Sequence, residues 1–436
     1  MNSLLNKYLV LYPVYLVRFE LFRYLRSLGK FVKICDIDED IKLKIRSMVE
    51  KADLSYYGNV FFAPDHLNRL GRIDTFLKSF PLMDKASARG YGFSCRPSEY
   101  SFLDKRSTSG STGEPFEFYK DRASTAVMDA IQTMAFSWHG IDPGDKQARF
   151  WGMPSGKNRR IALLKDFVKN RIRFSAFDLS AERMSRFYKK MLRFTPSYFY
   201  GYPSLILEFG RFLKKRNLSL AQIPLKAIIG TGEYVAQGER QEFLDLFNLP
   251  LVSEYGCTET GVIGFECPSG NMHLMSPNIY LEVIDENGNE VHQGDEGEFV
   301  VTELNALYKP FIRYRLGDRG RKFKAACPCG CKYPVIEVSS GRKDDYIITP
   351  EGEKIYDAIL AYTLKKGVQK FKATQISVNT LSIDIIPNSD FTQLLRDHYI
   401  AELKHRISHK MMIDIHLVEK IERDRSGKLR YFKPLE

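Results

Sequence analysis

The sequence predicts an α/β protein with a large, multi-sheet N-terminal domain and a small α+β domain at its C-terminal end. Three observations predict this. The 436 residues exceed the length of one average domain. Helical and extended patterns alternate between about residues 120 and 250, which is typical of βαβ units and a mainly parallel sheet. A compact segment with its own helices and strands follows Gly341.

The large domain is expected to contain amphipathic helices and short buried strands in alternation. The helices are predicted over 181–194, 203–217 and 239–248, and the strands over 197–200, 225–230 and 249–252. The pattern changes at about residue 279, where two apolar runs, 280–284 and 298–302, are separated by the turn sequences Asn287-Gly288 and Gly294-Asp295. These runs predict antiparallel hairpins.

The segment after Gly341 is predicted to form the small domain. Its expected order is a helix near 355–366, strands near 370–377 and 380–386, a helix over 391–409 and a strand over 413–420. The predicted boundary therefore divides the chain into residues 1–340 and 341–436.

The composition is that of a soluble globular protein, with 44% hydrophobic and 27% charged residues. It excludes disordered, collagen-like and coiled-coil classes. The net charge of +12 favours polyanionic partners such as nucleic acids, anionic membranes or nucleotides, but charge alone does not choose among them. No nucleic-acid-binding motif accompanies the charge, so no nucleic acid partner is predicted.

Residues 1–35 are predicted to form basic amphipathic helices that are interrupted at Pro13. Six Lys or Arg residues stand against one Glu in this segment. It could pack on the body of the protein with a solvated basic face, or rest on an anionic membrane surface as a peripheral contact. The apolar run from Tyr8 to Phe19 is too short to span a bilayer and lacks a signal-peptide cleavage site. The expected location is cytoplasmic.

The stretch from Ser107 to Pro115 contains five hydroxyl residues and two glycines. Glycines allow successive backbone N–H groups to converge, and hydroxyls add further donors, so the stretch is suited to binding anionic oxygens. It is not a Walker A loop, because no Gly-Lys-Ser/Thr follows. A flexible surface loop is the alternative interpretation.

Four further motifs follow in the chain: Tyr255-Gly256-Cys257-Thr258-Glu259, Tyr314-Arg315-Leu316-Gly317-Asp318, Gly341-Arg342-Lys343-Asp344-Asp345 and Ser426-Gly427-Lys428-Leu429-Arg430. Together with the Ser/Gly loop, and in this order, they resemble the core motifs of adenylate-forming enzymes, the acyl-CoA synthetase superfamily. The second and third motifs are most similar to the phenylacetate–CoA ligase-like branch, which includes CapK-type capsule-biosynthesis proteins. The resemblance covers roughly residues 80–436.

The resemblance implies ATP-dependent activation of a small carboxylic acid as an acyl-adenylate, followed by transfer to CoA with release of AMP. An alternative is the same adenylation followed by transfer to an amine or hydroxyl acceptor in surface polysaccharide biosynthesis. A basic nucleotide-binding protein without turnover is a second alternative, although the intact Lys428 and Glu259 speak against it.

The resemblance also implies a set of ATP-binding residues. The Ser/Gly loop would hold the β- and γ-phosphates, Tyr255 would lie against adenine, and Asp318 would accept hydrogen bonds from both ribose hydroxyls. The full predicted set is Ser109, Gly110, Ser111, Thr112, Gly113, Gly232, Glu233, Tyr255, Gly256, Thr258 and Asp318.

The implied catalytic residues are Lys428, Glu259 and Arg342. Lys428 would bridge the attacking carboxylate and the α-phosphate, Glu259 would ligate Mg²⁺, and Arg342 would add a cation near the ribose or α-phosphate. The small domain would rotate about a hinge at Asp344 or Asp345 between the two half-reactions.

Cysteine spacing predicts a metal site in the β-rich part of the large domain, residues 262–338. Cys267 and His273 are followed by Cys327, Cys329 and Cys331. Closely spaced thiols in a cytosolic protein favour structural zinc over a disulfide, with unligated thiols and a redox role as alternatives. Some relatives in the resembled branch carry a similar set at Cys267, His273, Cys327 and Cys329, whereas Cys331 is the doubtful member.

Two further groups of residues carry open interpretations. Phe136, Trp138 and Tyr202 are candidates for the acyl pocket, with core packing as the alternative for Trp138 and its neighbour His139. A basic stretch could contact a phosphorylated acceptor or form a solvated face. It contains Lys157, Arg159, Arg160, Lys165, Lys169, Arg171 and Arg173.

Overall fold

The structure is a computed structural model. It describes residues 37–51, 76–94, 103–108, 116–151, 163–164, 166–175, 180–235, 237–324, 326–342, 346–364, 366–422 and 431–435. Several predicted features lie outside the described residues: the helices over 1–35, the loop residues Ser109 to Gly113, the hinge residues Asp344 and Asp345, and Lys428.

An eleven-stranded sheet forms the centre of the large domain within the described residues, in the order β10-β11-β12-β13-β9-β8-β7-β6-β5-β3-β4. One half is parallel: β3 (Gln147–Trp151), β4 (Arg171–Ser175), β5 (Tyr198–Gly201), β6 (Ala227–Thr231) and β7 (Leu251–Cys257). The other half is antiparallel: β8 (Gly261–Glu266), β9 (Met272–Leu274), β10 (Ile279–Ile284), β11 (Gly297–Glu303), β12 (Tyr314–Phe323) and β13 (Val335–Arg342). The sheet therefore combines the predicted βαβ region with the predicted hairpins.

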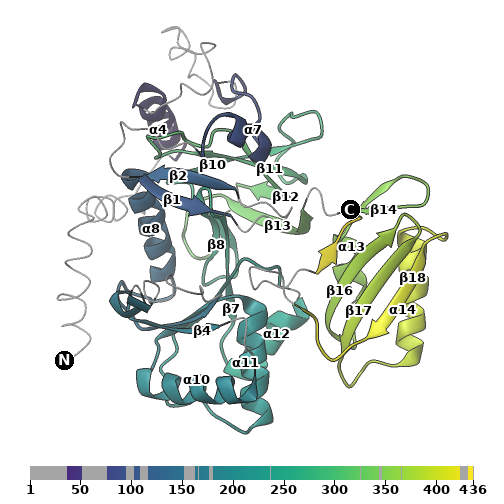
Figure 1. Ribbon diagram of the computed structural model, residues 1–436. Coiled ribbons are helices and arrows are strands. Elements are labelled where there is room, and N and C mark those ends of the chain that lie inside the picture. Colours follow the sequence, from purple (N-terminus) through teal and green to yellow (C-terminus); the bar gives the residue numbers. More distant parts are fainter. Residues whose placement is uncertain are drawn as a thin grey trace.

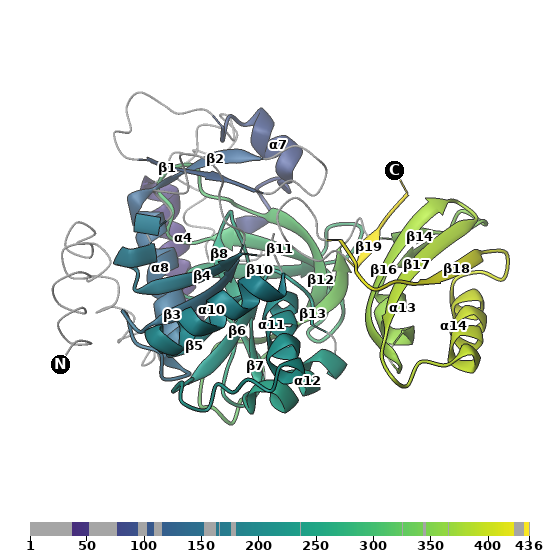
Figure 2. The same ribbon diagram turned by 60° about the horizontal axis from the view of Figure 1, so that its bottom comes forward.

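Helices cover both faces of the parallel half (Figures 1 and 2). On one face pack α10 (Ala181–Phe194), α11 (Pro203–Lys215) and α12 (Gln237–Phe247), which share a core with Phe150 and Phe199 of the strands. On the other face α8 (Arg122–Ser137) packs against Tyr198 and Tyr200. Successive strand residues thus alternate between two helix layers, which explains why β5 and β6 are buried on both faces.

A hairpin of β1 (Leu103–Ser107) and β2 (Glu117–Asp121) lies next to the antiparallel half. Two short helices, α4 (Ile37–Lys51) and α7 (Lys85–Gly90), share a hydrophobic core with this hairpin and with β10–β12. A buried ion pair between Lys120 of β2 and Glu303 of β11 joins the hairpin to the sheet. The side chains of this pair are 1% and 0% exposed.

The C-terminal domain is separate and has its own hydrophobic core. Its sheet has the order β18-β17-β16-β19, with β16 (Val368–Ser377), β17 (Thr380–Pro387), β18 (Met412–Leu417) and β19 (Phe432–Lys433). The helices α13 (Ala358–Thr363) and α14 (Gln393–Arg406) and a hairpin of β14 (Tyr346–Ile348) and β15 (Lys354–Tyr356) complete it. The helix expected near 355–366 begins only at Ala358, because residues 354–356 pair with β14 instead.

The C-terminal domain lies beside the large domain on the side of α12 (Figures 1 and 2), and side chains of α11 and α12 contact it. Lys370 of β16 forms an ion pair with Glu208 of α11. The Tyr431 hydroxyl, just before β19, donates to the Glu239 carboxylate of α12 at 3.1 Å. These contacts hold the C-terminal sheet beside the parallel half of the large domain. The exact domain boundary at residue 341 stays a prediction.

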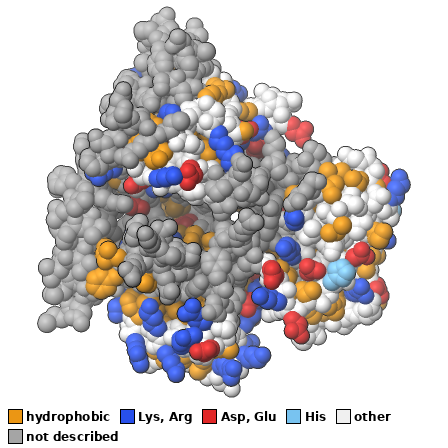
Figure 3. Space-filling model, in the orientation of Figure 1, with side chains coloured by type: hydrophobic (Ala, Val, Ile, Leu, Met, Phe, Trp, Pro, Cys, Tyr) orange, Lys and Arg blue, Asp and Glu red, His pale blue; other side chains and the backbone are white. Residues whose placement is uncertain are grey.

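One group of exposed basic side chains lies on the outer helices of the large domain. Figure 3 shows Lys and Arg side chains gathered at the bottom of the molecule, over α10 and α11. The exposed basic residues there are Arg183, Arg186, Lys189, Lys190, Arg193, Lys214 and Lys215. In the part of the chain that is described, none of the helices has the length and apolar character needed to cross a membrane.

Replacement of Lys120 by Met should destabilise the large domain strongly, because it leaves the Glu303 carboxylate buried without its cation. Removing one partner of a buried ion pair costs about 3–5 kcal/mol. Urea denaturation of Lys120→Met and of the wild type measures the loss.

The matched control is Lys105→Met, which removes the exposed partner of Glu117 on the same hairpin. Its side chain is 53% exposed, so the expected change in stability is far smaller. Equal effects of the two substitutions would contradict a structural role for the buried pair.

Candidate nucleotide site and metal centre

Two predicted ATP-binding residues, Tyr255 and Asp318, contact each other directly. The Tyr255 hydroxyl donates to Asp318 Oδ2 at 2.8 Å. Tyr255 is on β7 and Asp318 on β12, which lie four places apart in the sheet order. Strands four places apart in a flat sheet would be about 19 Å distant. The sheet therefore curls, so that its parallel and antiparallel halves face each other at this point.

A second contact of the same kind joins Glu259 and Tyr314. Glu259 follows β7 in a turn and is 3% exposed, and its Oε1 accepts a hydrogen bond of 2.8 Å from the Tyr314 hydroxyl. Burial and the adjacent Glu259 charge raise the pKa of Tyr314, so the phenol stays protonated and keeps donating. Among the described side chains, Tyr314 alone hydrogen-bonds to this carboxylate, which leaves Oε2 for a cation.

The motif that begins at Gly341 is brought next to Asp318 by strand pairing. Asp318 of β12 lies directly opposite Arg342 of β13 in the antiparallel register. The backbone thus places residue 342 next to residue 318 in the sheet. Residues of three of the five predicted motifs thus lie near Asp318, and their sharing of one nucleotide site stays a prediction.

The Ser/Gly loop is closed at its base by a backbone pairing. Thr108 N donates to Phe116 O at 3.0 Å, and Phe116 N donates to Thr108 Oγ1 at 3.2 Å. Asp121, at the end of β2, accepts from Ser124 N at the start of α8 and from Leu307 N and Tyr308 N of the loop after β11. The two ends of the loop are therefore anchored to the antiparallel half of the sheet.

Gly232 and Glu233, predicted at the edge of the pocket, follow β6. The Glu233 carboxylate accepts from Ser204 N at 3.0 Å and from Ser204 Oγ at 2.9 Å. Ser204 is in the first turn of α11, so Glu233 caps that helix. Sequence reasoning missed this structural role, since nothing in the local pattern links residues 204 and 233. Contact of Gly232 and Glu233 with a nucleotide stays a prediction.

The remaining residues of the 255–259 motif have local structural reasons. A Cβ atom on Gly256 would lie 2.4 Å from the backbone oxygen of Gly261, so only glycine permits this close pairing of β7 with β8. Burial raises the pKa of the Cys257 thiol to about 12, which gives no sign of an activated nucleophile. Thr258 is exposed in the turn that carries Glu259.

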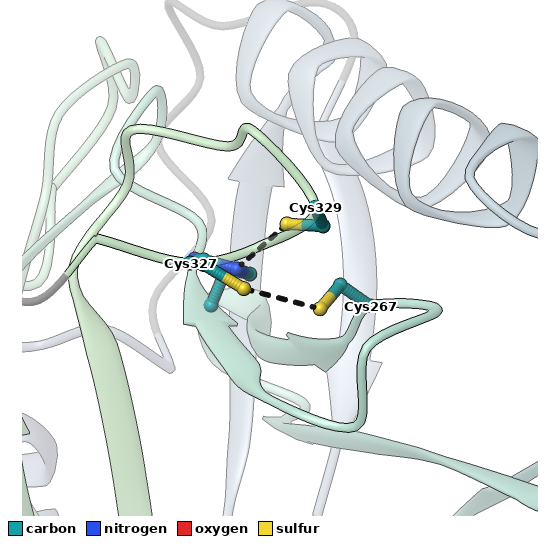
Figure 4. Close-up of side chains that lie close together, drawn as sticks. Cys267, Cys327 and Cys329 are labelled. Atoms are coloured by element: carbon teal, nitrogen blue, oxygen red, sulfur yellow. Dashed lines mark hydrogen bonds between the residues drawn. The ribbon is translucent and has the colours of Figure 1, made fainter.

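The four predicted metal ligands come together in space. The Sγ atoms of Cys267, Cys327 and Cys329 and a ring nitrogen of His273 all lie within 4.8 Å of one another. Cys267 follows β8, His273 is on β9, and the other two are in the loop between β12 and β13 (Figure 4). Four residues separated by up to 62 positions in sequence thus form one cluster.

The measured distances fit a tetrahedral zinc site. Zinc–sulfur bonds of about 2.3 Å separate two tetrahedral thiolates by about 3.8 Å, and a thiolate and an imidazole nitrogen by about 3.5 Å. The structure has 3.7 Å between Cys267 Sγ and Cys327 Sγ, and 3.3 Å between Cys329 Sγ and His273 Nε2. His273 Nδ1 lies 2.8 Å from the backbone oxygen of Tyr333, so it carries the proton and Nε2 faces the thiols.

Cys331 stands outside this four-residue cluster. Its backbone N–H donates to Cys329 Sγ at 3.4 Å, and Asn271 Nδ2 donates to Cys327 Sγ at 3.3 Å. Such donors stabilise thiolate ligands from outside the coordination shell. The sequence could not reveal Asn271 or the Tyr333 carbonyl in this supporting role, because a backbone oxygen leaves no trace in a motif.

The candidates for the acyl pocket divide between two places. Trp138, after α8, lies edge-on to the His273 ring, with 6.1 Å between the ring centroids. His139 Nε2 lies 2.8 Å from the backbone oxygen of Glu266. Both residues therefore pack beside the metal cluster. Tyr202 lies at the end of β5 and stacks on Trp151 at 4.4 Å. Phe136, near the end of α8, packs against the Tyr200 ring.

Comparison with known proteins shows what the chain is similar to. Residues 347–434 match the CapK C-terminal domain. Protein CapK of Staphylococcus aureus is 22% identical over 341 residues, which are 76% of this chain and 74% of that protein. The phenylacetate–coenzyme A ligase of Thermus thermophilus is 26% identical over 161 residues, 35% of this chain and 36% of that protein.

Among solved structures, 2-hydroxyisobutyryl-CoA ligase in the postadenylation state has the same fold. It matches with a TM-score of 0.69 and 21% identity over 91% of this chain and 88% of its own. The chain therefore shares the fold of this CoA ligase and is similar in sequence to CapK and to a phenylacetate–coenzyme A ligase. The similarity to CapK includes the C-terminal domain.

The cluster of Cys267, His273, Cys327 and Cys329 predicts about one zinc per chain in protein purified without added metal. Replacement of Cys329 by Ser should lower the zinc content substantially, because a closed structural site needs all four ligands. Elemental analysis of the purified proteins measures this.

Cys331→Ser is the matched control for the metal prediction, because it removes a neighbouring thiol that is not in the cluster. It should leave the zinc content near one. Zinc-free wild-type protein, or equal losses in both variants, would contradict the proposed ligand set.

Proposed function

We propose that the protein uses ATP to activate a small carboxylic acid as an acyl-adenylate and then transfers the acyl group to CoA with release of AMP. The observation that carries this proposal is the convergence of Tyr255, Glu259 and Asp318 at one point of a curled sheet. The fold shared with CoA ligases supports the same assignment.

The adenosine part of ATP would bind between β7 and β12. A carboxylate can accept hydrogen bonds from both ribose hydroxyls, and Asp318 is held in place by the Tyr255 hydroxyl. The Tyr255 ring is partly buried against Phe299, at 6.2 Å between ring centroids, so its orientation is fixed before a nucleotide binds. A preorganised aromatic ring and carboxylate suit a purine and its ribose.

The phosphates would lie between the Ser/Gly loop and Glu259. The loop residues Ser109 to Gly113 would donate to the β- and γ-phosphates from a base that Thr108 and Phe116 hold closed. Mg²⁺ is commonly held by one or two carboxylates together with substrate phosphates, and the open Oε2 of Glu259 fits that pattern. A bound Mg²⁺ would neutralise charge on the phosphates.

Adenylation joins two negatively charged reactants. A carboxylate oxygen of the acid attacks the α-phosphorus, and the bond from this phosphorus to the bridging oxygen of pyrophosphate breaks. Lys428 would bring its ammonium between the carboxylate and the α-phosphate, and Arg342 would add a second cation opposite Asp318. Both charges act where negative charge accumulates in the transition state.

In the second half-reaction the CoA thiol attacks the acyl carbonyl and AMP leaves. The small domain would turn about Asp344 or Asp345, withdraw Lys428 and open a path for the thiol. The contacts of Lys370 with Glu208 and of Tyr431 with Glu239 belong to the arrangement in this structure and would have to break in such a turn.

Zinc at the four-residue cluster would be structural. Four protein ligands complete a tetrahedral shell and leave no position for a substrate. The cluster cross-links β9 to the loop between β12 and β13 and so supports the strands that carry Asp318 and Arg342.

Exchange of labelled pyrophosphate into ATP, measured with a panel of carboxylic acids, tests the proposed adenylation. Exchange that depends on an acid is the expected result, and no exchange with any acid would contradict the proposal. AMP release with and without CoA then identifies the acceptor. A CoA-independent amide or ester product would favour an amine or hydroxyl acceptor instead.

Lys428→Ala should lower the acid-dependent exchange rate by about 10² or more, because it removes a charge used in the transition state. ATP binding, measured by calorimetry, should change little. The matched control is Lys420→Ala, an exposed lysine of the same domain, which should keep its exchange activity. Normal adenylation in Lys428→Ala would overturn the role of this lysine.

Asp318→Ala should weaken AMP binding about tenfold or more, because hydrogen bonds to a charged group contribute roughly 1.5–3 kcal/mol each. Calorimetric titration with AMP measures the effect. Asp295→Ala removes an exposed carboxylate from a turn next to β11 and should leave the Kd for AMP unchanged. Equal affinities of the three proteins would remove Asp318 from the proposed site.

A further inference from the structure

Arg149 on β3 is a half-buried cation that forms no ion pair with an acid among the described residues. Its guanidinium lies over the rings of Trp151 and Tyr200, at 4.7 and 5.2 Å from their centroids. Its Nε is fully enclosed and has no hydrogen-bond partner. The residue as a whole is half-buried, so part of its surface is accessible.

The acids near Arg149 are already engaged by other groups. Asp166 accepts from both arginines of the neighbouring strand β4, Arg171 and Arg173. These two arginines belong to the basic stretch expected to be solvated or to contact an acceptor, but their side chains are only 8% and 9% exposed. Asp166 thus forms its ion pairs with two other cations, and its single charge does not balance all three arginines.

Glu254 on β7 is the other nearby acid, and its oxygens are occupied by neutral donors. The Tyr200 hydroxyl donates to Oε1 at 2.8 Å and Gln132 Nε2 donates to Oε2 at 3.1 Å. Glu254 is buried and forms no ion pair with Arg149. The cluster of Arg149, Arg171 and Arg173 with Asp166 and Glu254 therefore retains a net positive charge.

Burial of an uncompensated cation costs free energy, which an anionic ligand would offset. Burial lowers the pKa of Arg149 to about 10, and the charges of Arg171 and Arg173 act in the same direction. The guanidinium remains protonated at neutral pH. It is therefore positioned to bind an anion rather than to switch its charge.

The position of Arg149 connects it to the proposed acid site. Arg149 is paired in register with Tyr200 of β5, and Thr231 of β6 is paired with Glu254 of β7. These residues lie near the carboxyl ends of adjacent parallel strands, the edge at which α/β sheets bind ligands. Glu254, whose carboxylate accepts from the Tyr200 hydroxyl, directly precedes Tyr255 in β7, so the neighbours of Arg149 and the proposed nucleotide site share one strand.

We propose that Arg149 binds a second anionic group of the acid, so that the substrate is a small dicarboxylic acid. This inference rests on the proposed function. The planar guanidinium suits bidentate binding of a carboxylate, and the stacked rings of Trp151 and Tyr202 form an apolar wall for the carbon chain. A carboxylate held by both oxygens at Arg149 cannot attack phosphorus, so the other carboxylate reacts.

Binding can be tested without catalysis, because the chain has two tryptophans. Trp138→Phe leaves Trp151, which stacks beside Arg149, as the sole reporter of fluorescence. Titrations use pairs of equal chain length: malonate and propionate, succinate and butyrate, glutarate and valerate. At least one dicarboxylate should change the emission saturably, whereas its monocarboxylate partner should bind at least about tenfold more weakly.

Arg149→Met in the same background should weaken dicarboxylate binding by about tenfold or more, because two charge-assisted hydrogen bonds are lost. Arg149→Lys keeps the positive charge but lacks the planar guanidinium. Its affinity for the dicarboxylate should therefore lie between those of the parent protein and Arg149→Met. Lys189→Met on the exposed face of α10 is the control that removes a distant cation. Circular dichroism verifies that all variants are folded.

Pyrophosphate exchange with the same pairs separates this inference from the proposed function. A preference for a dicarboxylate that Arg149→Met removes supports both. Exchange with monocarboxylates alone overturns the inference and leaves the proposed function intact. Dicarboxylate binding that depends on Arg149 without any exchange supports the binding site and contradicts adenylation.

A titration with pyrophosphate and ATP distinguishes the acid from a phosphate as the anion at Arg149. The proposal predicts no response of Trp151 that depends on Arg149 to either phosphate compound. A response to phosphates and not to dicarboxylates, or no binding of any dicarboxylate, would overturn the inference.

Discussion

The buried ion pair between Lys120 and Glu303 is the contact on which the candidate site depends. Lys120 lies on β2, directly after the Ser/Gly loop, and Glu303 is the last residue of β11, the neighbour of β12. Ser124 Oγ adds a hydrogen bond of 2.7 Å to the same carboxylate. The base of the proposed phosphate-binding loop and the strand that carries Tyr314 and Asp318 therefore belong to one rigid unit. Preorganised donors need no rearrangement when charge develops during the reaction.

The curl of the central sheet is the second constraint. Parallel strands bring residues to their carboxyl ends, and the antiparallel strands fold back so that β12 faces β7. A single sheet thus supplies the floor for a candidate acid site around Arg149 and Tyr200 and the wall for a candidate nucleotide site at Asp318. The metal cluster ties β9 to the loop before β13 and so lies behind that wall.

Local signals in the sequence predicted much of the fold. The helix over 181–194 matches α10 at both ends, because Ser180 caps its first turn and apolar residues recur with helical spacing. The hairpin of β10 and β11 follows from turn sequences between alternating strands. Cysteine spacing, together with the family resemblance, also led to the four residues that the structure brings together.

Interactions between distant residues could not be predicted in the same way. The cap that Glu233 provides to α11, and the sharing of Asp166 by Arg171 and Arg173, depend on which elements become neighbours in space. Arg149 carried no signal in the sequence, since an arginine in a strand is usually exposed or paired. Residues 354–356 joined a strand rather than a helix because a partner, β14, was available.

A crystal structure of the protein with bound AMP would show directly whether the nucleotide binds at Tyr255 and Asp318. We expect the adenine to lie against Tyr255 and the Asp318 carboxylate to accept hydrogen bonds from both ribose hydroxyls. We also expect the phosphate to point toward Glu259 and the Ser/Gly loop. AMP bound elsewhere on the molecule, with the Tyr255–Asp318 contact undisturbed, would contradict the account.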